Sequence, residues 1–127
     1  METKLVMCDT NIFIHWFRND AQTIEKLMAI GVENIVISAI TKMELLLGTE
    51  NKQELAAMKR KISSYPVIPI TDAVSVRAIE YIESYRLSHN LQIPDALIGA
   101  TATNFDLSLF TYNLKDFRFL PNIKLYD

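Results

Sequence analysis

The amino-acid sequence predicts an α/β fold of three layers, in which a mostly parallel sheet of four or five strands lies between two layers of helices. Two observations carry this prediction. Short segments such as 5–8 and 35–37 are apolar at consecutive positions, which is typical of strands buried on both faces. Segments with helical spacing of apolar residues separate these runs, and strands that alternate with helices build parallel sheets with helices on both faces.

Length and composition favour one domain spanning residues 1–127, with 50% hydrophobic residues to form its core. A total of 13 Lys and Arg against 15 Asp and Glu gives a net charge of -2, so any nucleic-acid binding must be local. No segment approaches membrane-spanning length, and we expect no membrane association. The single cysteine, Cys8, lies in an apolar run, which excludes a disulfide framework within the chain and fits the cytoplasm.

Five segments are predicted as strands from their apolar and β-branched residues. They are residues 4–8, 34–38, 67–70, 107–110 and 123–126. Pro69 interrupts the third segment, which places that strand at an edge of the sheet because proline cannot donate to a neighbouring strand. The last segment is also expected at an edge.

Helices are predicted in the intervening sequence. They cover residues 12–17, the stretch between Asp20 and Gly31, residues 39–47 and 53–64, a long segment from Asp72 to a loop at His89, and residues 94–104. Asp20 is expected to cap the second helix and Gly31 to end it. The inner face of that helix is expected to be formed by Ile24, Leu27 and Met28.

Four carboxylates stand out against this framework. Asp9 and Asp116 follow strands, at the edge where open α/β sheets place ligands. Glu44 shares a helix face with Ile40 and Leu47, and Asp95 lies after Pro94 in the first turn of an otherwise small and apolar helix. We expect these acids to converge, although they come from distant parts of the chain.

Carboxylates brought together would destabilise the fold unless a cation neutralised them. Mg²⁺ prefers such oxygen ligands and keeps waters that further carboxylates can hold, and Mn²⁺ suits the same ligands. A zinc site is disfavoured because no histidine or cysteine pair has the required spacing. An ion at this position would activate water and offset charge on a phosphodiester, which predicts hydrolysis of nucleic acid.

Short polar side chains beside the acids are suited to orienting a carboxylate, a water or a phosphate oxygen. They are Thr10, Asn11, Thr111 and Asn113. Three cations adjoin the acids in sequence and are candidate contacts to an RNA backbone: Lys42, Lys115 and Arg118. The basic run at 59–61 is interpreted as a solvated helix face, with phosphate steering as the alternative. His15 and His89 are interpreted as packing or surface residues.

Four motifs together resemble those of the PIN-domain ribonucleases, specifically the VapC-like toxins of bacterial and archaeal toxin-antitoxin pairs. The motifs are Asp9-Thr10-Asn11, the helix Thr41-x-x-Glu44-Leu45-x-x-Gly48, the segment from Pro94-Asp95 to Ala102, and Thr111-x-Asn113-x-x-Asp116-Phe117. The resemblance implies that Asp9, Glu44, Asp95 and Asp116 are the acidic metal-binding quartet. It further implies a PIN-like fold, a Mg²⁺- or Mn²⁺-dependent endoribonuclease, a homodimer, and inhibition by a cognate antitoxin.

Three other interpretations use the same residues. A receiver-type signalling domain would have adjacent acids after the first strand, where only Asp9 stands, and a lysine where Thr111-Tyr112-Asn113 stands. A phosphatase of the haloacid dehalogenase type would have an aspartate at Asn11. A PIN-like binding module without catalysis is the remaining alternative, and the complete set of four acids speaks against it.

Overall fold

The computed structural model describes residues 4–126, and within them five strands form one parallel sheet. The strands are β1 (Val6–Cys8), β2 (Ile35–Ser38), β3 (Val67–Ile68), β4 (Ser108–Phe110) and β5 (Lys124–Leu125). Their spatial order is β3-β2-β1-β4-β5, with every neighbouring pair parallel. The α/β prediction is therefore confirmed, the sheet is wholly parallel, and β3 and β5 lie at its edges as expected.

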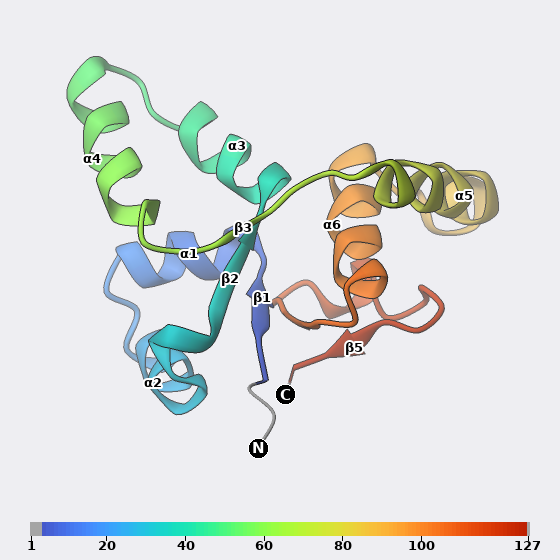
Figure 1. The fold of residues 1–127 in the computed structure, drawn as a ribbon, viewed down its shortest axis with the longest axis horizontal. Coiled ribbons are helices and arrows are strands. Elements are labelled where there is room, and N and C mark those ends of the chain that lie inside the picture. The colour runs from blue at the N-terminus through green and yellow to red at the C-terminus, as the bar shows by residue number, and fades with distance from the viewer. Residues whose placement is uncertain (1–3, 127) are drawn as a thin grey trace.

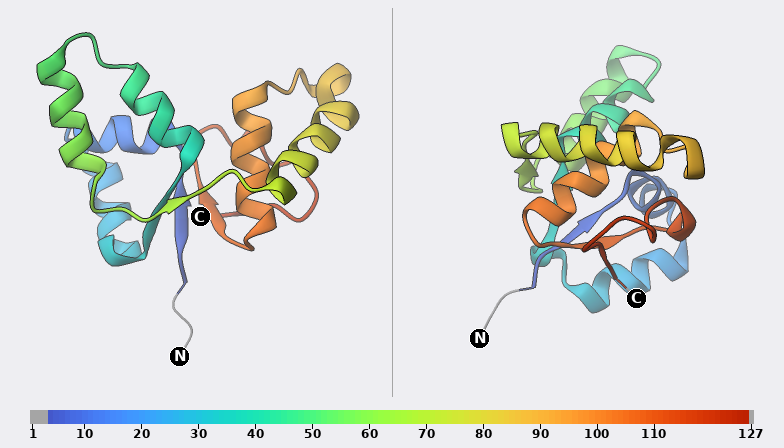
Figure 2. Two further views of the ribbon diagram at one scale, coloured as in Figure 1. Left: turned by 45° about the horizontal axis from the view of Figure 1, so that its top comes forward. Right: turned by 90° about the vertical axis from the view of Figure 1, so that its right-hand side faces the viewer.

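Helices cover both faces of the sheet (Figure 1). They are α1 (Thr10–Phe17), α2 (Ala21–Ile30), α3 (Ala39–Leu47), α4 (Lys52–Ile62), α5 (Asp72–His89) and α6 (Ile93–Asn104), with short 3-10 turns η1 (Val32–Asn34) and η2 (Leu114–Asp116). Helices α1 and α2 lie on one side of β1 and β2, and α5 and α6 lie on the other. Helices α3 and α4 form a V that projects beyond the sheet (Figure 2). No helix among residues 4–126 is long and apolar enough to cross a membrane.

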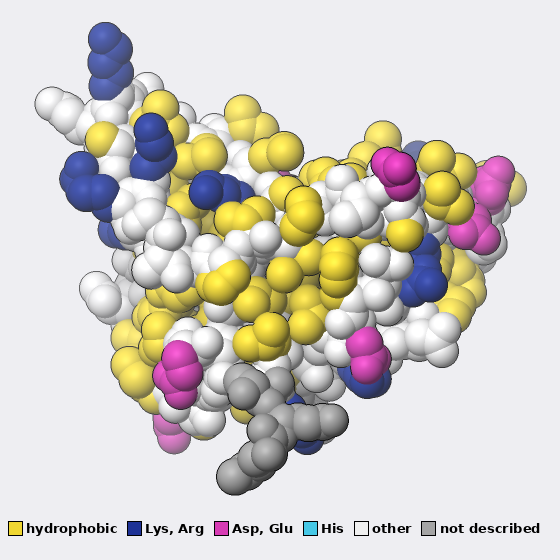
Figure 3. Space-filling model, viewed as in Figure 1, with side chains coloured by type: hydrophobic (Ala, Val, Ile, Leu, Met, Phe, Trp, Pro, Cys, Tyr) yellow, Lys and Arg dark blue, Asp and Glu magenta, His cyan; other side chains and the backbone are white. Residues whose placement is uncertain are grey.

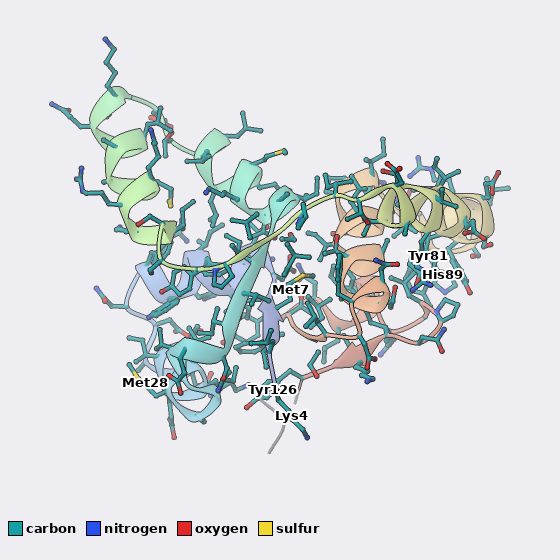
Figure 4. All side chains as sticks on the ribbon, viewed as in Figure 1. Lys4, Met7, Met28, Tyr81, His89 and Tyr126 are labelled. Carbon is teal, nitrogen blue, oxygen red and sulfur yellow. The ribbon has the colours of Figure 1, made fainter. Side chains whose placement is uncertain are left out.

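Strand β1 explains why its residues are apolar without alternation. Val6 and Cys8 point into the cluster formed with α1, α2 and α4, whereas Met7 points into the cluster formed with α5 and α6. Met7 lies near the middle of the molecule, between β1 and α6 (Figure 4). Successive side chains on a strand face opposite ways, so a strand covered on both faces must be apolar throughout. Burial raises the pKa of the Cys8 thiol to about 12, as expected of an inert internal cysteine.

The helix start predicted at Asp20 is confirmed, and a side chain caps α5 in the same way. Asp20 accepts a hydrogen bond from the Thr23 backbone N–H at the start of α2, and Gly31, with a φ of 91°, ends that helix. Thr71 accepts from the Val74 N–H at the start of α5. These local interactions satisfy backbone donors that have no partner within a helix, which is why they can be read from sequence.

Two details differ from the sequence prediction. Met28 was expected on the inner face of α2, but it is 61% exposed and lies at the outer margin of the molecule (Figure 4). Thr23 takes an internal place in α2 instead, because its hydroxyl donates to Asp20. His89 was expected in a loop, but it is the last residue of α5, where its ring stacks on Phe119 at 4.0 Å between centroids.

Gly99 lets α6 approach the segment that follows β4. A Cβ atom at Gly99 would lie 2.4 Å from Leu120 Cδ1 and 3.7 Å from Phe117 Cδ1, and both of those side chains are buried. The close approach is therefore to the turn that carries Asp116, as well as to the core behind it. A side chain at position 99 would push these two parts of the site apart.

We expect Gly99→Ala to lower the free energy of unfolding by up to about 2 kcal/mol, because overpacking costs about 1–3 kcal/mol and alanine returns about 1 kcal/mol of helix propensity. In a Leu120→Ala background the same substitution should become stabilising, since the clashing methyl is gone. Urea denaturation of the four proteins of this cycle measures both effects. A stabilising Gly99→Ala in the unmodified chain would contradict the close packing.

Candidate active site

The candidate site lies where β1 and β4 end side by side. Asp9 directly follows β1, and its backbone N–H donates to Phe110 O at 2.9 Å, so the first residues beyond the two strands remain paired. Thr111 directly follows β4 and is buried. The carboxyl ends of parallel strands form the edge at which α/β proteins hold ligands, because side chains from several loops converge there. The chain order thus brings Asp9 and Thr111 together across 102 residues.

Asp9 is held by two hydrogen bonds. Its Oδ1 accepts from the Thr10 backbone N–H at 2.8 Å, at the start of α1, and its Oδ2 accepts from Thr111 Oγ1 at 2.8 Å. The Thr111 hydroxyl itself accepts from the Asn113 N–H at 3.0 Å. Each carboxylate oxygen has a second lone pair, so these bonds orient Asp9 and still leave it able to bind a cation.

The pKa of Asp9 lies above its usual value. Burial is the largest cause, since only 5% of the residue surface is exposed. The hydrogen bonds from Thr111 and Thr10 oppose this shift, and the nearby charges of Glu44 and Asp116 add to it. Burial therefore disfavours the charged form of Asp9, and the hydrogen bonds from Thr10 and Thr111 offset part of this cost.

Glu44 reaches the same edge from α3. Ser38, at the end of β2, accepts from the Thr41 N–H and starts this helix. Thr10 Oγ1 donates to Glu44 Oε1 at 2.6 Å and lies 3.2 Å from Thr41 Oγ1. Thr41 and Glu44 are three residues apart and share one helix face, so Thr10 joins the start of α1 to α3 through both of them.

Asp95 occupies the first turn of α6 after Pro94, as predicted, and is partly buried. Its pKa is raised to about 6, first by burial and then by the charges of Asp9, Asp116 and Glu44. Thr10 bonds to both Asp9 and Glu44 and so holds these two acids close together, whereas the convergence of all four acids stays a prediction. Asp116 stands at the end of η2, which places it beyond β4 by one turn.

None of the four acids forms an ion pair with a Lys, Arg or His side chain among residues 4–126. Within residues 4–126 the one ion pair closer than 4.0 Å joins Lys124 to Asp106, both exposed. In the same part of the chain, no three acidic, histidine or cysteine side chains are arranged to enclose an ion by themselves. The acids remain candidate ligands for Mg²⁺ or Mn²⁺ because these ions need only one or two direct carboxylates and hold others through water. A closed structural zinc site would need four direct ligands.

The other predicted residues differ in their place. Thr10 and Thr111 bond directly to the acids, whereas Asn113 contributes through its backbone. Asn11 is half-buried in the first turn of α1. Of the three predicted cations, Lys115 and Arg118 are exposed and lie in sequence beside Asp116. Lys42 is half-buried on α3.

Sequence reasoning missed two supporting contacts. The first is the contact of Thr41 with Thr10, which the spacing of Thr41 and Glu44 on one helix face could have indicated. Tyr112 lies between Thr111 and Asn113, and its hydroxyl bonds to Thr23 Oγ1 on α2, which in turn donates to Asp20. This contact fastens the loop after β4 to α2. It joins residues 89 apart in sequence, and no local pattern indicates it.

Comparison with known proteins agrees with this fold. Residues 6–120 match the model of the PIN domain. Ribonuclease VapC19 of Mycobacterium tuberculosis is 30% identical over 122 residues, covering 93% of this chain and 96% of the relative. The tRNA(fMet)-specific endonuclease VapC of Salmonella typhimurium is 27% identical over 126 residues, covering 95% and 96%.

Solved structures give the same result. A toxin-antitoxin complex from Klebsiella pneumoniae has a chain with a TM-score of 0.76 and 30% identity, covering 93% of this chain and 94% of that one. The DNA-bound VapBC complex of Salmonella typhimurium has a chain with a TM-score of 0.82 and 25% identity, covering 98% of both. With the family model matching most of its length, this chain belongs to the PIN-domain family and, within it, to the VapC-like ribonucleases.

Proposed function

We propose that this protein is a metal-dependent endoribonuclease that acts as the toxin of a toxin-antitoxin pair. The observation that carries the proposal is that Thr10 bonds to both Asp9 and Glu44 at the carboxyl edge of the sheet, with no Lys, Arg or His within 4.0 Å of either acid among the described residues. Membership of the VapC-like ribonucleases supports RNA as the substrate. The four acids are the proposed metal-binding and catalytic residues.

The donor set supports Mg²⁺ as the cofactor, with Mn²⁺ as a substitute, because every candidate ligand is a carboxylate oxygen. When bound, such an ion lowers the pKa of a coordinated water and offsets negative charge on the phosphodiester. Asp9 is the most fixed of the proposed ligands, since both of its oxygens are engaged by Thr10 and Thr111. Asp95 and Asp116 complete the set from α6 and η2.

The chain orients the remaining reactants through its own polar groups. Thr10 holds Glu44 at Oε1, and the second carboxylate oxygen can accept a hydrogen bond from the attacking water. Lys42, Lys115 and Arg118 are proposed to contact phosphates next to the scissile bond, because they lie in sequence beside Glu44 and Asp116. Asn11 and Asn113 are proposed to bind a water or a phosphate oxygen.

Two protein partners are proposed. The first is an antitoxin, which the similarity to toxin-antitoxin complexes supports. The second is another copy of this chain. Apolar side chains gather over the middle of one face, around β3, and along α5 (Figure 3), and the exposed members include Met43, Val67, Val76 and Ile79. The cytoplasm is the proposed location because its RNA is accessible there and Cys8 stays reduced.

The purified protein should cleave RNA when Mg²⁺ or Mn²⁺ is present and stop when a chelator is added. Asp95→Asn should lower kcat/KM about 100-fold or more, because it removes charge from the proposed cation site. Gel analysis of a labelled structured RNA measures the rate.

The matched control for this experiment is Asp72→Asn, which makes the same change in the first turn of another helix, at an exposed position. It removes the same interaction with a helix dipole but lies outside the site. Equal loss by both variants would indicate a structural effect. RNA binding without metal-dependent cleavage would favour the PIN-like binding module.

Metal binding should also change the dependence of stability on pH. The folded chain holds a proton on Asp95 up to about pH 6, whereas the unfolded chain releases it near the ordinary value of 3.8. Because the folded state binds more protons in this window, the metal-free protein loses stability from this group as pH rises through it. Mg²⁺ should therefore raise Tm more near neutral pH than at about pH 5. At a hundredfold excess of free metal over Kd, the stabilisation at neutral pH should be about 2.7 kcal/mol.

Differential scanning fluorimetry across pH, with and without metal, measures this effect. In Asp95→Asn, Tm should depend less on pH in this range, and the increase in Tm caused by metal should be smaller. A metal response that is equal at both pH values would contradict the proposed site.

Thr111→Val should weaken metal binding about 10–100-fold, because the hydroxyl that orients Asp9 is lost while side-chain volume is kept. Titration of Tm with Mn²⁺ gives the change in apparent Kd. The matched control is Thr101→Val, a buried threonine whose hydroxyl donates to Leu97 O within α6. An equal loss in the control would assign the effect to packing.

A further inference from the structure

We infer that the exposed face of helix α4 is a docking surface for the phosphate backbone of the RNA substrate, outside the acidic site. The inference rests on the proposed ribonuclease function and deepens it. It replaces the interpretation of residues 59–61 as a solvated helix face. The interaction surface consists of Lys52, Lys59 and Arg60, and it is distinct from the three cations proposed beside the acids.

Charge is unevenly distributed along this chain. Helix α4 contains four cations and one acid, Glu54, and so carries a net charge of +3, whereas the whole chain carries -2. The rest of the chain is therefore acidic, with four carboxylates gathered at one edge of the sheet. An RNA strand is repelled by that edge in the absence of cations, so attraction beyond the reach of Lys42, Lys115 and Arg118 has to come from another element. Helix α4 is the element whose charge can supply it.

The cations of α4 are open to solvent and border a shallow hollow. Lys52, Lys59 and Arg60, with Leu55 and Ala56 between them, line a depression of about 380 Å³. Figure 3 shows dark-blue side chains gathered over α4 at the left of the molecule. Among residues 4–126 none of them lies within 4.0 Å of a carboxylate oxygen, and Glu54 is instead bonded to Asn51. Their charge is thus available to a ligand.

The spacing of these cations fits an extended strand. Lys52 and Lys59 are seven residues apart, which is about 10 Å along a helix axis. That length covers more than one phosphate of a nucleic-acid strand. The small apolar floor between the cations allows a sugar-phosphate backbone to approach without displacing a polar group. A single bound anion would need only one end of this surface.

Helix α4 is also connected to the acidic site. Met58, next to Lys59 in sequence, lines a pocket of about 250 Å³ together with Glu44 and Arg18. Phe17 lines the same pocket, and Lys61 Nζ lies 5.2 Å from the centre of its ring. Arg18 and Lys61 therefore lie beside the pocket that Glu44 and Met58 line. A strand bound at the acids and along this pocket would reach α4.

Helix-dipole stabilisation explains only part of the pattern. Lys59, Arg60 and Lys61 lie in the last turn of α4, where the dipole favours cations. Lys52 is the first residue of the helix, where the dipole disfavours a cation. Lys52 nevertheless lines the same depression as Lys59 and Arg60. Binding of an anionic strand accounts for all three positions.

The test compares two double variants with equal loss of charge. Lys59→Gln/Arg60→Gln removes two cations from α4, and glutamine keeps helix propensity nearly unchanged. Lys4→Gln/Lys124→Gln removes two exposed lysines that line a depression with Asp106 and Phe105, outside α4 and the site. The exposed pair between Lys124 and Asp106 contributes little to stability, so this control should fold normally.

Steady-state cleavage of a labelled RNA with Mg²⁺ gives kcat and KM for each protein. Fluorescence anisotropy with a fluorescein-labelled single-stranded RNA, in an Asp95→Asn background, gives Kd across a salt series. The α4 variant should raise KM and Kd several-fold, with the loss falling on KM because these phosphates lie away from the scissile bond. It should reduce the slope of log Kd against log salt by about 1.4, or about 0.7 for each lost contact.

The Lys4→Gln/Lys124→Gln control should leave KM and the salt slope unchanged, which separates a local surface from net charge. Equal changes in both variants, or no change in the α4 variant while the unmodified protein cleaves RNA, would overturn the inference and leave the proposed function intact. If α4 instead serves an acidic protein segment, the α4 variant would lose binding to a polyglutamate peptide with unchanged affinity for RNA, and this result would also overturn it. Absence of cleavage by the unmodified protein would instead count against the proposed function.

Discussion

Repulsion among four carboxylates is the constraint on which the carboxyl edge of this sheet depends. Burial raises the pKa of Asp9 and of Asp95, and the charges of the nearby acids raise both pKa values further. The fold counters this only in part, through donors from Thr10 and Thr111. The remaining electrostatic cost makes a cation at this edge a matter of stability as well as of chemistry.

Much of the fold follows from local sequence. Consecutive apolar residues in β1 and β2 identify strands covered on both faces, and Asp20, Ser38 and Thr71 cap helices through bonds to residues three positions later. Pro94 marks the start of α6 for the same local reason. These features could be predicted because each is decided by neighbours within one turn or one strand.

Contacts between distant segments could not be predicted in the same way. The exposure of Met28, the bond from Tyr112 to Thr23, and the approach of Gly99 to Leu120 all depend on how finished elements pack. The meeting of Asp9 and Thr111 could be predicted because strand order in a parallel sheet brings strand ends to one edge. The roles of the four acids in binding metal and cleaving RNA stay predictions. The net charge of -2 likewise gives no indication that α4 alone carries +3, since a sum conceals how charge is distributed.

Asp9 has two structural roles that cannot be separated. The same carboxylate that faces the other acids also accepts the Thr10 N–H and starts α1. When a ligand binds Asp9, the hydrogen bond from the Thr10 backbone N–H changes, and with it the chemical shift of that amide in the first turn of α1. The amide signal of Thr10 is accordingly a built-in reporter of site occupancy, readable by NMR without any label in the site. In this protein, binding at the sheet edge and the hydrogen bond that starts α1 are therefore coupled through one side chain.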